Sequence, residues 1–261
     1  FMNQYHSFVK AYGKVNLGLD VTGKRDDGYH LVRMIMQSVD ICDDVTIRVE
    51  DSTEDRTDEH AKERTEDRRK DPCEIRITCD HPDVPTDRRN LAFRAAELII
   101  RQYGLHARIC IDIRKRIPMA AGMAGGSADA AAVITGMNQC FQLGMCMDEQ
   151  DAIAVQLGAD VPFCLRHGTW LAEGIGEQLT KVADLPHCYM VIVKPGFGVS
   201  TPWAYRELDA LTKKQDSMIQ HPDIDALIGA LNRRDIRNIA DHMGNILEAA
   251  VISACDRVDS R

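Results

Sequence analysis

The stretch 118–128 has the residue types best suited to bind a phosphate chain. Its residues read Pro-Met-Ala-Ala-Gly-Met-Ala-Gly-Gly-Ser-Ala and lead into the alanine-rich run 129–135, which favours a helix. Glycine has no Cβ to keep a ligand away from the backbone, and the first turn of a helix offers unpaired N–H groups with partial positive charge. The spacing predicts a phosphate-binding loop. A tight turn capped by Ser127 would use the same residues, so other segments must decide.

Two further segments place polar residues in apolar settings. In Gly13-Lys-Val-Asn-Leu17, a strand would turn Lys14 and Asn16 to one face and the intervening apolar residues to the other. Asp160 stands between a predicted helix end and the apolar stretch 161–165, which we expect to be a strand. Taken singly, Lys14 also fits a surface residue, and Asp160 also fits a helix cap or turn.

Composition and charge narrow the class of protein. The 261 residues are 44% hydrophobic and 28% charged, a balance typical of globular proteins. The formal net charge of −8 argues against a nucleic-acid partner, which calls for a basic surplus or stripe. The glycine-rich stretch is not a Walker A motif, and no Gly-x-Gly-x-x-Gly opens a βαβ unit, so P-loop and dinucleotide-binding functions lose support.

Cysteine usage and hydropathy point to a cytoplasmic protein. The nine cysteines include no Cys-x-x-Cys pair, which disfavours both a disulfide framework and a zinc site. No run of about 18 apolar residues is present, so we expect no membrane partner.

The predicted elements follow an α+β order, with strands first and helices later. We expect strands over 9–21, 31–39, 45–49, 74–78, 107–114, 168–176 and 188–194. We expect helices over 90–104, 127–140, 148–157, 223–231 and 235–249.

The predicted domains are residues 1–168, which carry the phosphate-binding loop, and residues 169–261. Within the first, segment 51–71 holds nine acidic and six basic residues with one apolar residue. Such a segment cannot bury enough surface to fold by itself, so we expect a charged, solvated insertion.

In their order along the chain, three segments resemble the signatures of the GHMP kinase superfamily. They are Lys14-Val-Asn16, the stretch 118–127 and Leu157-Gly-Ala-Asp-Val-Pro162. Further similarity runs from about residue 12 to 248, through segments 23–30, 36–40, 90–92, 168–177 and 194–201. It narrows the resemblance to a branch that phosphorylates a cytidine-diphosphate sugar alcohol on the non-mevalonate route to isoprenoid precursors. The resemblance implies an ATP-binding N-terminal domain similar to ribosomal protein S5, followed by a C-terminal α+β domain.

The resemblance also implies a catalytic pair and a nucleotide site. Asp160 would accept the proton of the substrate hydroxyl, and Lys14 would keep that carboxylate ionised. ATP would bring Mg²⁺, with Ser127 as a contact to phosphate or magnesium. Asn90 is expected beside adenine. The implied loop contacts to ATP are Pro118, Met119, Ala120, Ala121, Gly122, Met123, Ala124, Gly125, Gly126, Ser127 and Ala128.

The same resemblance implies a site for a small cytidine-diphosphate substrate. Asn16 would contact the diol, Tyr29 and His30 would hold cytosine, Thr201 would line the pocket, and Tyr205 would stack on the base. The simpler alternative for His30 is a buried structural histidine.

One departure from the family pattern leaves alternatives open. Family members carry a third, Ser-Gly-rich motif near the C-terminus, whereas no glycine follows Gly244 here. We therefore expect an incomplete C-terminal domain. The alternatives are a homoserine- or mevalonate-type kinase of the same superfamily and a catalytically impaired nucleotide-binding homologue.

Overall fold

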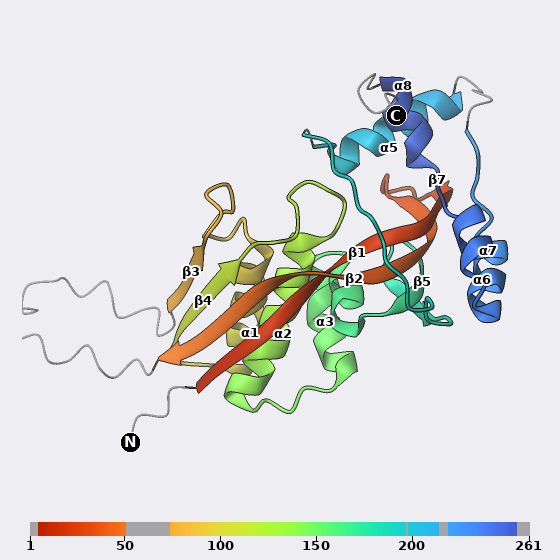
Figure 1. Cartoon of the computed structure of the whole chain (residues 1–261). Helices are drawn as coiled ribbons and strands as arrows, with labels where there is room; N and C mark the ends of the chain where they lie inside the picture. Colours follow the sequence, from red (N-terminus) through yellow and green to blue (C-terminus); the bar gives the residue numbers. More distant parts are fainter. Residues whose placement is uncertain (1–4, 51–73, 197, 214–218, 255–261) are drawn as a thin grey trace, which may run out of the picture. The chain divides into compact units, whose positions relative to one another are not determined.

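A computed structural model describes residues 5–50, 74–196, 198–213 and 219–254 (Figure 1). The predicted charged insertion 51–71 lies outside these residues. The chain forms two compact units whose segments interleave along the sequence. Unit 1 comprises Phe1–Ala11, Ile41–Arg116 and Gly125–Leu165, and unit 2 comprises Tyr12–Asp40, Ile117–Ala124 and Arg166–Arg261. The predicted domain boundary after residue 168 stays a prediction.

Two long strands, β1 (Tyr5–Lys24) and β2 (His30–Glu50), each contribute to both units. A short turn joins them, in which Arg25 N donates to Tyr29 O at 2.8 Å and Gly28 adopts a positive φ of 91°. The strands of the sheet follow the order β3-β4-β2-β1-β7, and β5 pairs with β2 and β6. The remaining strands are β3 (Glu74–Cys79), β4 (Arg108–Arg114), β5 (Thr169–Glu173), β6 (Gln178–Lys181) and β7 (Gly244–Asn245).

Unit 1 packs three helices together beside its strands: α1 (Leu91–Tyr103), α2 (Gly125–Phe141) and α3 (Met147–Leu157) (Figure 1). Helix α1 begins where the Asn90 side chain accepts from Ala92 N, and it ends at Gly104 in the left-handed conformation. Helix α2 lies close on β2, since a Cβ on Gly136 would stand 2.2 Å from Ile47 Cδ1. The strands meet these helices with buried isoleucines and valines, as their alternation predicts.

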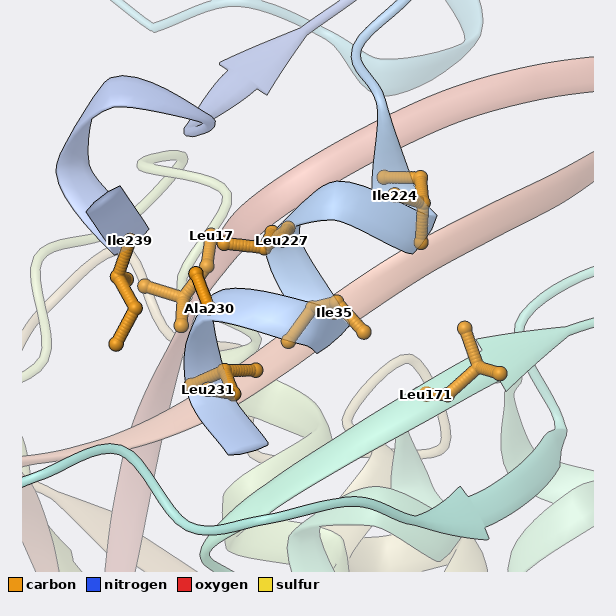
Figure 2. Close-up of a cluster of buried hydrophobic side chains, with 8 residues drawn as sticks. All are labelled: Leu17, Ile35, Leu171, Ile224, Leu227, Ala230, Leu231 and Ile239. Atoms are coloured by element: carbon orange, nitrogen blue, oxygen red, sulfur yellow. The ribbon is translucent and has the colours of Figure 1, made fainter. Parts of the chain in front are cut away.

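Unit 2 has its own apolar core, shown in Figure 2. Helices α6 (Ile224–Arg233) and α7 (Ile236–Asp241) supply its helical side, and β1, β2 and β5 supply the rest. Gly18 on β1 lets α6 come close, because a Cβ there would lie 2.8 Å from Ile224 Cδ1. The buried members are Leu17, Ile35, Leu171, Ile224, Leu227, Ala230, Leu231 and Ile239.

Several sequence expectations are confirmed and others are wrong. The α+β class is confirmed, as are the strand at 74–78 and the helix ending at Gly104. The strands expected over 31–39 and 45–49 are parts of one strand, β2. The helix expected over 235–249 is two helices, α7 and α8 (Leu247–Ala254), with β7 between them.

Three elements of the second half differ from expectation. Segment 188–194 forms no strand, although its residues alternate, because a strand needs a hydrogen-bonded neighbour and none of the described strands provides one. The stretch after Asp160 is a helix, α4 (Val161–Arg166). Helix α5 (Thr201–Lys213) was not predicted. Of the helices in the described ranges, none is long and apolar enough to cross a membrane.

The core of unit 2 makes a direct prediction. Leu227 is fully buried against β1, so Leu227→Ala should lower the free energy of unfolding by about 2–5 kcal/mol, through lost burial and the cavity left behind. Ile236→Ala on α7 is the control, since that side chain is exposed and its truncation should cost less than about 0.5 kcal/mol. Urea denaturation of both variants measures the difference. Equal losses would contradict the packing shown in Figure 2.

Candidate active site

The predicted phosphate-binding loop has the backbone that an anion site requires. The φ angle is positive at Ala120 (51°), Gly122 (70°) and Ala124 (57°), and it is not positive at the residues between them. Such alternation turns successive N–H groups toward one side of the chain and makes a concavity that suits an anion. Two of the three positions are alanines, for which the left-handed conformation costs about 1–2 kcal/mol each.

The end of this loop leads into the first turn of α2, which belongs to unit 1. Gly125, Gly126 and Ser127 form that turn, whose N–H groups have no partner further back in the helix. A Cβ added to Gly122 or Gly126 would meet no atom within 4 Å. Packing therefore does not require these glycines, and they leave the backbone open to a ligand.

Lys14 lies beside the loop within unit 2. Its backbone N–H donates to Met123 O at 3.1 Å, which ties β1 to the loop. Its side chain is buried, with 5% of the residue exposed, and Nζ donates to Asn16 Oδ1 at 3.0 Å. The prediction that Lys14 and Asn16 share one face of a strand is confirmed. A buried ammonium on a strand tied to this loop is suited to neutralise negative charge.

Asp160 marks the start of α4 in unit 1. Its carbonyl accepts from Cys164 N at 3.1 Å, so the residue stands at the N-cap position. The sequence is compatible with a helix here, because aspartate is favoured at the N-cap position and Pro162 is tolerated in a first turn. Lys14 and Asp160 belong to different units, and their pairing remains part of the proposal below.

The residues expected to hold cytosine come together partly around α5 in unit 2. The rings of His30 and Tyr205 stack, with centroids 4.7 Å apart and planes at 21°. His30 Nε2 also lies 2.8 Å from Asp209 Oδ1, and Lys24 Nζ donates to Asp209 Oδ2 at 2.5 Å. A cavity of about 560 Å³ is lined by Lys24, His30 and Asp209 among others. Tyr29 lies in the turn before β2 and is exposed.

Sequence reasoning missed Asp209 and Lys24. Asp209 follows Tyr205 by four residues, which places both on one face of a helix, but this signal is only visible once α5 is recognised. Thr201 is the exposed first residue of the same helix. Only 12% of the His30 side chain is exposed. A buried structural histidine, the simpler alternative, would show the same burial. Its contact with cytosine stays a prediction.

Asn90 has a clear local role. Its amide oxygen accepts from Ala92 N at 2.9 Å, and its amide nitrogen donates to Pro85 O at 2.8 Å. The side chain therefore fixes the segment before α1, and a contact between Asn90 and adenine stays a prediction.

Comparison with known proteins defines the class. A family model for the GHMP kinases N terminal domain matches residues 90–168. The crystal structure of 4-(cytidine 5'-diphospho)-2C-methyl-D-erythritol kinase gives a TM-score of 0.67 at 27% identity, covering 97% of this chain and 80% of that chain. An L. major mevalonate kinase also gives 0.67, at 14% identity over 98% and 78% of the two chains, which supports the fold alone. The fold is that of a GHMP kinase.

Curated relatives narrow this class. The 4-diphosphocytidyl-2-C-methyl-D-erythritol kinase of Acetivibrio thermocellus is 44% identical over 94% of this chain and 77% of the relative. The Bacillus pumilus enzyme of the same name is 39% identical over 96% and 78%. The chain belongs to the family of 4-diphosphocytidyl-2-C-methyl-D-erythritol kinases, in agreement with the resemblance carried by its motifs. It is therefore an ATP-dependent small-molecule kinase.

The group around Asp209 predicts a pH-dependent contribution to stability. Burial would raise the pKa of Asp209, but the hydrogen bonds from Lys24 and His30 outweigh burial and lower it. A lowered pKa means that the ionised carboxylate stabilises the fold above the unfolded value of about 3.9, and that this is lost as the pH falls through the folded value.

Asp209→Asn should therefore lower the free energy of unfolding at neutral pH by at most about 1 kcal/mol, because the group is partly exposed. Urea denaturation at several pH values between about 6 and 2.5 should show the gap between variant and unmodified protein closing below about pH 4. A gap that stays constant or widens toward acid pH would contradict the ion-pair account.

Proposed function

We propose that this protein transfers the γ-phosphoryl group of ATP to the 2-hydroxyl of 4-diphosphocytidyl-2-C-methyl-D-erythritol, a step of the non-mevalonate route to isoprenoid precursors. The observation that carries the proposal is similarity over nearly the whole chain to enzymes named for this substrate, with 44% identity over 94% of the chain in one case. The cytoplasm is the proposed location, since ATP is available there and the cysteines of the described residues are free thiols.

The nucleotide end of the proposed site uses backbone groups more than side chains. Phosphoryl transfer needs positioning and charge neutralisation rather than covalent help from the protein. The alternating backbone of residues 118–124 and the first turn of α2 would hold the triphosphate. Mg²⁺ would neutralise charge between the phosphates when bound, and the Ser127 hydroxyl is the side chain we propose to face phosphate or magnesium. Asn90 would contact adenine.

Proton transfer is assigned to Asp160. Its carboxylate would accept the proton of the substrate hydroxyl as the bond to phosphorus forms. Lys14 would keep that carboxylate ionised and stabilise the developing alkoxide. The support is local: Lys14 is buried beside the loop, and Asp160 is held at the start of a helix.

The acceptor end is assigned to the side chains around α5 and β1. Asn16 would contact the diol, and Tyr205, which stacks on His30 in the structure, would stack on the base. Tyr29 and His30 would hold cytosine, and Thr201 would line the pocket. Hydrogen bonds to the edge of the base would separate cytosine from other bases, because a mismatched base leaves buried polar groups unpaired.

Two other functions compete less well. A homoserine kinase structure matches with a TM-score of 0.61 at 18% identity, which supports the shared fold only. A catalytically impaired nucleotide-binding protein is the other alternative, but it leaves Lys14 and Asp160 without a catalytic role.

An acceptor screen tests the proposed reaction. ADP release in the presence of ATP and Mg²⁺ should rise with 4-diphosphocytidyl-2-C-methyl-D-erythritol and stay near background with homoserine or mevalonate. The kinase proposal is falsified if ATP binds and none of the acceptors stimulates ADP release. If homoserine or mevalonate stimulates ADP release more strongly, the protein is instead a homoserine- or mevalonate-type kinase.

Replacement of Asp160 tests the proposed base. Asp160→Asn removes the proton acceptor and keeps the side-chain size, so turnover should fall by about 100-fold or more while ATP affinity changes little. Asp83→Asn, at an exposed loop carboxylate, is the matched control and should keep turnover unchanged. Unchanged turnover in Asp160→Asn would remove the residue from this role.

A further inference from the structure

A buried charge cluster lies where β4 gives way to the phosphate-binding loop. The Lys115 ammonium donates to Asp43 Oδ2 on β2 and, at 2.8 Å, to Asp129 Oδ2 on α2. The side chains of Lys115, Asp43 and Asp129 are 7%, 0% and 3% exposed. All three residues belong to unit 1. None of them is used in the reaction proposed above.

The cluster links the residues on either side of the loop, because Lys115 precedes it and Asp129 follows it. Lys115 stands three residues before Pro118, where the loop begins, and Asp129 follows Ala128, where it ends. Backbone hydrogen bonds also fix the residues that precede the loop. Lys115 N donates to Asp80 Oδ1 at 2.8 Å, and Arg116 N donates to Asp43 Oδ1. The carboxylates of Asp43 and Asp80 thus fix the chain just after β4, and the Lys115 side chain links this segment to α2.

This arrangement is not what stability alone would favour. One ammonium faces two carboxylates, and among the described residues Asp129 Oδ1 has no hydrogen-bond partner although it is buried. Burial would lower the pKa of Lys115, but Asp129 and Asp43 outweigh burial and raise it, so the cation persists. Buried ion clusters are commonly no more stabilising than apolar residues of similar size, and an unpaired buried oxygen adds a cost. Such a cost in stability is expected where the cluster serves to hold a helix or loop in a particular position.

We propose that Lys115 and Asp129 are positioning residues of the nucleotide site, which hold the first turn of α2 in the orientation that binds the triphosphate. The inference rests on the proposed function, because it takes Gly125–Ser127 as phosphate contacts. Asp129 is the fifth residue of α2 and lies one turn from Gly125, so a tether at this residue limits both rotation and sliding of the helix. Neither side chain is assigned a contact with ATP.

Two variants separate positioning from stability. Lys115→Met removes the tether and leaves two facing carboxylates, so the protein should become less stable and bind nucleotide about tenfold more weakly, because small displacements at such sites are costly. Asp129→Ala removes the tether to α2 but leaves the Lys115–Asp43 pair intact and adds a good helix former. It should keep the stability and still weaken nucleotide binding about three- to tenfold.

Titration calorimetry with ADP, and separately with the cytidine-diphosphate acceptor, gives the decisive readout. We expect weaker ADP binding with acceptor affinity within about twofold of the unmodified protein, and a matching rise in the KM for ATP. Lys181→Met breaks an exposed ion pair with Asp184 and is the matched control, with both affinities unchanged.

ADP affinity within about twofold of the unmodified protein in Asp129→Ala would overturn the inference, as would equal losses for ADP and acceptor. If Lys115→Met does not fold, Asp129→Ala decides alone. Calorimetry does not require turnover, so a protein that binds ADP but phosphorylates none of the acceptors refutes the proposed reaction and leaves this inference testable.

Discussion

The continuity of β1 and β2 is the constraint on which the rest of the structure depends. Each strand contributes one half to unit 1 and the other to unit 2, so both cores are built on the same two stretches of chain. Unit 1 covers its half with α2, and unit 2 covers its half with α6. Close approach is needed in both places: Gly136 of α2 admits Ile47 of β2, and Gly18 of β1 admits Ile224 of α6.

Local signals made much of the first half predictable. The helix after Asn90 and its end at Gly104 follow from a side-chain cap and a residue that tolerates positive φ. The conformation of the glycine-rich loop was recognisable for the same reason, since it depends on residues that tolerate positive φ and not on distant side chains. The shared face of Lys14 and Asn16 follows from strand periodicity alone.

Features that depend on tertiary partners were not predictable. The sequence around Asp43 looks like a break between strands, yet β2 continues through it because Lys115 and Arg116 satisfy the buried carboxylate. Segment 188–194 has the alternation of a strand but no strand partner within the described ranges. Asp209 beside His30 became visible only with α5, because residues 179 positions apart carry no local signal. The proposed site residues come from several segments and rest on family resemblance, which supplies information that periodicity does not.

In the proposed reaction, Lys14 and Asp160 act on one hydroxyl group. A crystal structure with a non-hydrolysable ATP analogue, Mg²⁺ and 4-diphosphocytidyl-2-C-methyl-D-erythritol tests this claim most directly. We predict that an Asp160 carboxylate oxygen lies within about 3.2 Å of the acceptor 2-hydroxyl, that Lys14 Nζ lies within hydrogen-bond reach of both, and that the γ-phosphate rests on the backbone of residues 118–128. An acceptor hydroxyl that faces another base, or a triphosphate bound away from the loop, would contradict it.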